Sequence, residues 1–132
     1  MSFRRQERMM ALGIRQVHPL LDRQATRRRH QALECARRVL SRFRNLGIEG
    51  YVVGSLASGR FMAHSDIDFL VTHCPRDIDR LLLEAEVEQL CGDMPYHLIF
   101  LDEIQDLYWR RKLLAERKTL EELEAGDAAG VV

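Results

Sequence analysis

Two aspartates, Asp66 and Asp68, stand one residue apart at the start of an apolar run in this chain of 132 residues. Alternate side chains of a β-strand face the same side, so both carboxylates point one way, about 7 Å apart. Like charges held that close repel each other, and a divalent cation between them removes the repulsion. The spacing therefore predicts a site for Mg²⁺, with Mn²⁺ as the other candidate, held by these two carboxylates.

A Gly-Ser pair lies ten residues before the first aspartate. Gly54 lets backbone N–H groups approach an anion closely, and the hydroxyl of Ser55 adds a further donor. Arg60, farther along the same loop, either contacts a phosphate or is an exposed charge without a role. Phosphate donors beside two metal-binding carboxylates indicate a site for a metal-bound phosphate compound.

Hydrophobic patterns predict the elements that hold these residues. Leu33, Ala36 and Leu40 recur at helical spacing, whereas three short runs rich in β-branched and aromatic residues indicate strands. In chain order, the expected elements are helices at 3–17 and 26–46, strands at 48–53 and 66–71, a helix at 77–91, a strand at 96–101 and one final helix from Asp102, its cap, to Gly126. This order predicts an α/β (α+β) fold, with a small mixed β-sheet of about three to four strands packed with helices and preceded by an N-terminal helical segment.

Composition indicates one globular domain, because 46% apolar residues can form a single core in a chain of this length. No run is apolar enough to span a membrane, and the charged start is unlike a secretory signal, so we expect a cytoplasmic protein. Cys35, Cys74 and Cys91 include no CxxC pair. We therefore expect reduced thiols that fill apolar space, and neither disulfides nor a zinc site.

The net charge is zero, but the charges are unevenly distributed. Residues 1–49 carry twelve arginines against four acidic residues, a net charge of +8 that the rest of the chain compensates. Such a basic segment can bind nucleic acid, attract the acidic half of its own chain, or form a solvated helix face. All three interpretations stay open on the sequence.

The stretch GSLASGRFMAHSDIDFLV, residues 54–71, resembles the GS-x10-DxD motif of the DNA-polymerase-β-like nucleotidyltransferase superfamily. Gly59 and Ser65 also stand where many members have a glycine and a serine, and the similarity extends over about residues 48–104. The short length is similar to that of the minimal nucleotidyltransferase (MNT) branch. We therefore divide the chain into a helical segment packed on the domain at 1–46, an MNT domain at 47–126 and a frayed tail at 127–132.

The resemblance implies transfer of AMP from ATP to a macromolecular hydroxyl, with release of pyrophosphate. Asp66 and Asp68 would ligate Mg²⁺ or Mn²⁺ and act in catalysis. The residues implied in nucleotide binding are Gly54, Ser55, Gly59, Arg60 and Ser65.

The family usually has a third carboxylate on the next core strand, and the polar residue at that place in this chain is His97. An imidazole can serve as a general base, or as a nitrogen ligand that favours Mn²⁺ over Mg²⁺. Alternatively, the site is weakened, and the protein binds nucleotide without efficient transfer. Both interpretations stay open.

MNT proteins of this size resemble the antitoxins of HEPN/MNT toxin–antitoxin pairs, which implies a HEPN ribonuclease partner that receives AMP on a tyrosine. One alternative is a catalytically impaired module that neutralises such a partner by binding alone. Another is a transferase that contacts nucleic acid through its arginine-rich segment. We do not favour the latter, because that segment lacks aromatic residues on which bases could stack. No membrane partner is expected.

Overall fold

The computed structural model describes the backbone of residues 19–129 and the side chains of residues 23–126. The helix expected at 3–17 lies outside the described residues, as do residues 130–132 of the expected tail. The strands are β1 (Glu49–Val53), β2 (Ile67–His73) and β3 (Tyr96–Phe100). They form one sheet in the order β1-β2-β3, with β1 antiparallel and β3 parallel to the central β2. The expected small mixed sheet is confirmed.

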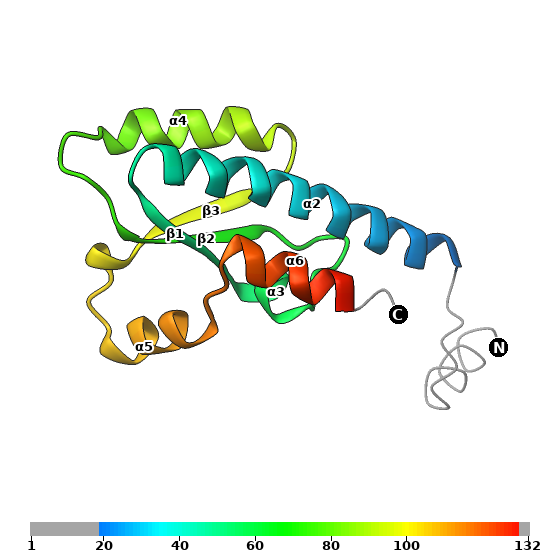
Figure 1. Ribbon diagram of the computed structural model, residues 1–132. Helices are drawn as coiled ribbons and strands as arrows, with labels where there is room; N and C mark the ends of the chain where they lie inside the picture. Colours follow the sequence, from blue (N-terminus) through cyan, green and yellow to red (C-terminus); the bar gives the residue numbers. More distant parts are fainter. Residues whose placement is uncertain (1–18, 130–132) are drawn as a thin grey trace.

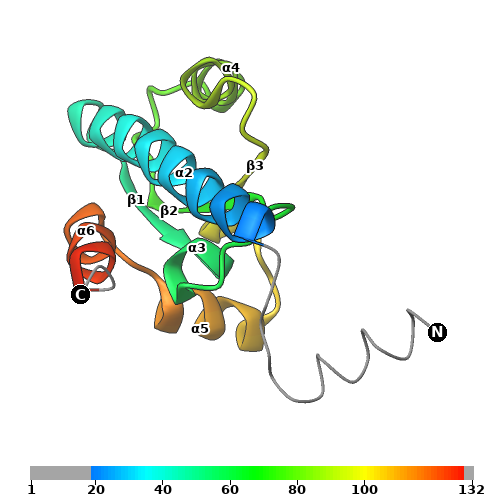
Figure 2. The ribbon, with the colours of Figure 1, turned by 90° about the vertical axis from the view of Figure 1, so that its right-hand side faces the viewer.

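Helices cover both faces of this sheet (Figures 1 and 2). The helices are α2 (Pro19–Asn45) and α4 (Arg80–Cys91) on one face, α3 (Gly54–Ser58) and α5 (Leu107–Glu116) toward the other, and α6 (Leu120–Ala129) beside α2. Within residues 19–129, none of the helices is both long and apolar enough to cross a bilayer.

The central strand β2 is covered on both faces, and its alternation decides which way the aspartates point. Ile67, Phe69 and Val71 pack in the main core against α2 and α4. Leu70 points the other way, into a smaller cluster under α5. By the same alternation, Asp68 lies on the α5 face of the sheet.

Helix α2 supplies the longest buried face of the core. Its described part runs from Pro19 to Asn45 and so includes residues before the expected start at residue 26. Its fully or almost fully buried residues are Ala32, Cys35, Ala36, Val39, Leu40 and Phe43. The helix is therefore part of the same core as the sheet.

The prediction of one final helix at 102–126 is wrong, because the helical backbone is interrupted at two points in this segment. The first interruption lies before α5, and the second lies between α5 and α6. Asp102 lies in a short 3₁₀ helix, Leu101–Glu103, and pairs with Arg80 at 2.5 Å. The cap of α5 is instead Asp106, whose carboxylate accepts two backbone N–H groups of the first turn at 2.9 and 3.3 Å. The expected capping role of Asp102 is thus wrong as well.

The second interruption comes from Lys118, which exchanges two backbone hydrogen bonds with Val52 of β1, at 3.0 and 2.8 Å. Extended backbone at this point separates α5 from α6. Thr119 and Glu122 then start α6 with reciprocal hydrogen bonds, each side chain accepting the other residue's backbone N–H. The helix continues to Ala129, into the segment that we expected to fray.

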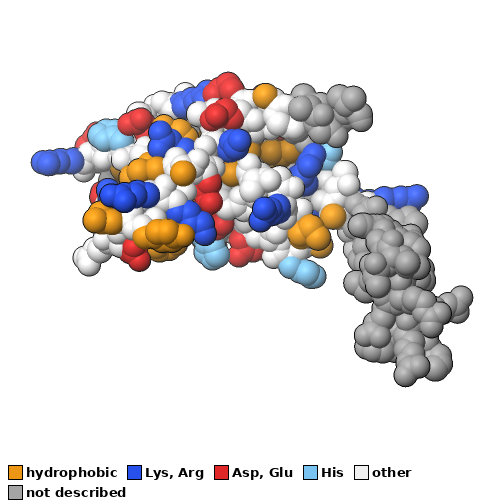
Figure 3. Space-filling model, turned by 90° about the horizontal axis from the view of Figure 1, so that it is seen from below, with side chains coloured by type: hydrophobic (Ala, Val, Ile, Leu, Met, Phe, Trp, Pro, Cys, Tyr) orange, Lys and Arg blue, Asp and Glu red, His pale blue; other side chains and the backbone are white. Residues whose placement is uncertain are grey.

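Arginines of the basic segment pair with glutamates of the acidic half. The pairs are Arg37 with Glu124 at 3.1 Å, Arg44 with Glu121 at 2.6 Å, and Arg42 with Glu86. On the side of the molecule seen from below α5, positive, negative and apolar side chains are interspersed (Figure 3). Attraction between the two halves thus accounts for these three arginines.

Candidate functional site

Strand pairing brings residues that are far apart in the sequence to one place on the α5 face of the sheet. Asp68 pairs with Val53 of β1 on one side and with His97 of β3 on the other. Gly54 follows Val53 directly, and Asp66 stands just before β2. The structure therefore gathers the glycine, both aspartates and the histidine singled out in the sequence.

Gly54 is the point at which the backbone and a carboxylate meet most closely. Its φ of 74° lies in the left-handed region that favours glycine. A Cβ atom at this position would lie 2.3 Å from Oδ2 of Asp68. The backbone N–H of Gly54 donates to Oε1 of Glu116 on α5, at 3.2 Å. Only a glycine lets the Asp68 carboxylate lie against this turn.

Of the other residues predicted to bind nucleotide, Ser55 lies in α3, whereas Gly59, Arg60 and Ser65 lie in the loop between α3 and β2. The carbonyl of Ser55 accepts the N–H of Arg60 at 2.8 Å and the N–H of Gly59, the left-handed cap of α3. Oγ of Ser65 accepts the N–H of Met62 at 2.9 Å. These contacts shape the loop, and the role of the four residues toward a nucleotide stays a prediction.

His97 lies between the two aspartates. Its Nδ1 is 3.0 Å from Oδ1 of Asp68, and its Nε2 is 3.8 Å from Oδ2 of Asp66. With the Nδ1 proton donated to Asp68, Nε2 carries the lone pair that can take up a proton. The His97 side chain is 65% exposed, so a reacting group can reach it from outside.

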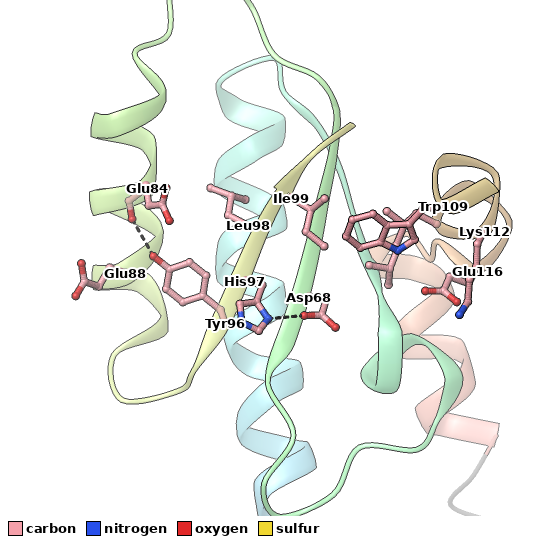
Figure 4. A pocket seen from close by; sticks show the side chains of 12 residues that line it. Asp68, Glu84, Glu88, Tyr96, His97, Leu98, Ile99, Trp109, Lys112 and Glu116 are labelled. Carbon is pink, nitrogen blue, oxygen red and sulfur yellow. Dashed lines mark hydrogen bonds and ion pairs between the residues drawn. The ribbon is translucent and has the colours of Figure 1, made fainter. Parts of the chain in front are cut away.

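A cavity of about 810 Å³ opens beside this cluster (Figure 4). Its lining includes Trp109, Lys112 and Glu116, which the sequence analysis did not single out. These positions share one face of α5, but their spacing alone does not reveal that this face is turned toward the sheet. The full lining is Val53, Asp68, Glu84, Glu88, Tyr96, His97, Leu98, Ile99, Trp109, Lys112, Leu113 and Glu116. The indole of Trp109 and the ammonium group of Lys112 therefore line the same cavity as Asp68.

The two carboxylates fit a Mg²⁺ ion that is shared with a phosphate ligand. Mg²⁺ takes oxygen ligands, and proteins commonly supply only one or two carboxylates while substrate phosphates and water complete the shell. Within the described residues, no group of three or more His, Cys, Asp and Glu side chains is arranged to hold a metal ion. Asp66 and Asp68 are thus the two carboxylates that could hold such a cation, and its binding stays a prediction.

The fold and these residues can be compared with known proteins. A family model for the nucleotidyltransferase domain matches residues 33–123. The chain belongs to the nucleotidyltransferase domain family. The matched segment starts in α2 and ends in α6, so this nucleotidyltransferase domain includes Gly54, both aspartates, His97 and the α5 wall of the cavity.

A solved structure supports the same assignment. The chain is similar to a protein assigned as a minimal nucleotidyltransferase, with 25% identity and a TM-score of 0.53 over 63% of this chain and 86% of that one. No curated protein matches the chain. The membership of the nucleotidyltransferase family that the motif predicted is thus confirmed, and the similarity to this structure supports a minimal nucleotidyltransferase domain.

Proposed function

We propose that this nucleotidyltransferase is metal-dependent and moves AMP from ATP to a hydroxyl of a macromolecule, with release of pyrophosphate. The observation that carries the proposal is the position of Asp68, pressed against the turn at Gly54 on one side and hydrogen-bonded to His97 on the other. The resemblance to the family implies that this turn would hold the triphosphate and that the two aspartates would hold the cation.

Asp66 and Asp68 would hold the cation, which when bound would neutralise charge on the triphosphate and on the departing pyrophosphate. The acceptor oxygen forms a bond to the α-phosphorus while the bond from that phosphorus to pyrophosphate breaks. The acceptor proton passes to Nε2 of His97, because Nδ1 is engaged with Asp68. Asp66, at 3.8 Å from Nε2, stabilises the imidazolium that results.

The proposed acceptor is a tyrosine hydroxyl on a HEPN-type ribonuclease, as the resemblance to MNT antitoxins implies, so that AMP transfer would silence a toxin. The exposure of His97 supports an acceptor of this kind, because a side chain of another macromolecule can approach the base from solvent. Asp66 and Asp68 beside it are partly buried, with 38% and 29% of their side chains exposed.

The test is incubation of the purified protein with α-labelled ATP and Mg²⁺ or Mn²⁺, with and without a co-expressed HEPN-type partner, followed by intact-mass analysis of each protein. We expect one or more AMP units on the partner. Asp68→Asn should reduce the transfer rate by at least roughly 100-fold, because it removes a carboxylate that holds the cation. The matched control is Asp77→Asn, which changes an exposed aspartate in the loop after β2. This variant should leave the transfer rate unchanged.

A second candidate function is neutralisation of a partner by binding alone. Two observations favour it. His97 stands where the family has a carboxylate, and the carboxylate of Glu116 accepts the hydrogen bond of the Gly54 backbone N–H. Metal-dependent ATP binding without transfer under either metal would decide for this candidate. Absence of both binding and transfer would overturn the proposed function altogether.

A further inference from the structure

Two cysteines that are far apart in the sequence meet in the core, on the side of the sheet opposite the site. Cys35 of α2 is fully buried and Cys91, the last residue of α4, is 5% exposed. Their sulfur atoms are 2.6 Å apart. The sequence expectation treated these thiols as separate apolar fillers, since their spacing of 56 positions gives no local sign of pairing.

The two helices hold the sulfur atoms together at a fixed point. The Nε of Arg38 donates to the carbonyl of Leu90 at 3.0 Å, which ties the middle of α2 to the end of α4. Gly92, with a φ of 61°, ends α4 directly after Cys91. A bond between the sulfur atoms therefore needs little movement of either helix.

The surroundings also divide the chemical roles of the two thiols. The hydrogen bond between the two thiols, together with the positive charge of Arg38, lowers the pKa of Cys35 against the opposing effect of burial. The same hydrogen bond and burial raise the pKa of Cys91. Since a thiolate is the reactive form of cysteine, Cys35 is the nucleophile and Cys91 the resolving thiol.

We propose that Cys35 and Cys91 are an oxidative modification site that forms an intramolecular disulfide with a hydroperoxide as oxidant. The Cys35 sulfur attacks one peroxide oxygen, so that an S–O bond forms, the O–O bond breaks and water leaves after protonation. The Cys91 sulfur then attacks the Cys35 sulfur, the S–S bond forms and the S–O bond breaks to release a second water. Two thiols are oxidised, and one hydrogen peroxide is reduced to two waters.

The cross-link would enclose the part of the chain that carries the site. The segment between the two cysteines contains β1, α3 and β2, with Gly54, Asp66 and Asp68. A disulfide closing a loop of this length restricts the unfolded chain and stabilises the folded one. This inference does not depend on the proposed transfer activity, because neither thiol contacts the site.

The test uses the full chain, treated with hydrogen peroxide and separately refolded from urea in a glutathione redox buffer, and then blocked with N-ethylmaleimide in urea, so that every thiol not in a disulfide is labelled. Intact mass and peptide mapping should show a Cys35–Cys91 disulfide, loss of two hydrogens and one labelled thiol. The melting temperature should rise by roughly 5–10 °C and fall back on reduction. Refolding gives the oxidant access to thiols that are buried in the native protein.

Cys74 provides the matched control, since it lies outside this pair, and its thiol contacts only the adjacent Pro75 carbonyl among the hydrogen bonds of the described residues. Cys74→Ser should form the same disulfide as the unchanged protein. Cys35→Ala should leave Cys91 open to maleimide under both treatments. Full labelling of all three thiols after oxidative refolding, or a disulfide that includes Cys74, would overturn the proposal.

Discussion

At the scale of single residues, the proposed site depends on Asp68, because its two carboxylate oxygens have different neighbours. Oδ1 is 3.0 Å from Nδ1 of His97, whereas Oδ2 lies where a side chain at Gly54 would have to be. Changes at position 54 or 97 therefore act on the site through the same carboxylate.

Gly54→Ala should lower the free energy of unfolding by roughly 2–4 kcal/mol, since it combines a left-handed backbone with a clash against Asp68. Gly59→Ala is the matched control: its φ of 79° is similar, but its added Cβ would meet no atom within 4 Å. In the control, the free energy of unfolding should fall only by the cost of the left-handed backbone for alanine, roughly 1–2 kcal/mol. Urea denaturation measures both, and equal losses would contradict a clash with the carboxylate.

His97→Ala should reduce the transfer rate by roughly 100-fold or more, because it removes the proposed proton acceptor. His97→Asp should retain part of the activity, since a carboxylate can take the same proton and belongs to the usual pattern of the family. Single-turnover rates with labelled ATP measure both variants. A faster rate in His97→Asp than in the unchanged protein would mean that the histidine impairs the site.

At the scale of helices and strands, α5 decides what can enter the cavity. Trp109, Lys112 and Glu116 line it from one face of this helix, and Figure 4 shows the indole beside Ile99 and near Asp68. An ATP molecule whose phosphates lie at Gly54 could thus place its base toward the tryptophan.

Trp109 is the only tryptophan of the chain, so its fluorescence reports on α5 alone. We expect ATP with Mg²⁺ to quench it, and Trp109→Ala to weaken ATP binding by roughly 10-fold, as loss of one stacking contact would. Trp109→Phe should bind almost as tightly as the unchanged protein. Equilibrium dialysis provides the independent affinity, and equal affinity in Trp109→Ala would place the base elsewhere.

The sequence predicted those elements whose patterns are local. The strands and α4 follow from short apolar runs, and the face of β2 on which Asp68 lies follows from the alternation of that strand. The end of α5 could not be predicted, because Lys118 is held extended by Val52, a partner far away in the chain. The start of α6 did have a local signal, the reciprocal cap of Thr119 with Glu122, which the continuous helical pattern concealed.

The residues of α5 that line the cavity could not be predicted from the sequence either, because their orientation also depends on contacts with distant parts of the chain. Which face of α5 meets the sheet depends on the turn through Asp106 and on the packing of Leu113 under the helix. Membership of the family, in contrast, followed from a few fixed positions around Gly54 and Asp68, since motif residues are close together in the sequence.

At the scale of the whole molecule, ion pairs connect elements across the fold, and the pair of Arg80 with Asp102 has a defined pH dependence. The hydrogen bond from Arg80 holds the pKa of Asp102 below its usual value. A carboxylate of this kind stabilises the fold above its unfolded pKa, and the contribution is lost as the pH falls through the lowered folded value.

Asp102→Asn should therefore lower the free energy of unfolding at pH 7 by less than about 1 kcal/mol, because solvent screens an exposed pair. The difference between the two proteins should disappear at pH values below the lowered pKa, where both forms are uncharged. Urea denaturation at pH 7 and at low pH measures it. A difference that persists in acid would assign the effect of the variant to something other than this ion pair.

The central position of β2 also sets the order in which the site can be assembled during folding. Asp68 meets the end of β1 after a short loop, but it meets His97 only after the chain has passed through α4, 29 residues later. Closing the longer loop costs more chain entropy, so we expect β3 to dock last. A chain still being folded would then hold both carboxylates but lack the proposed base, and would become able to transfer a nucleotide only when its last strand is in place.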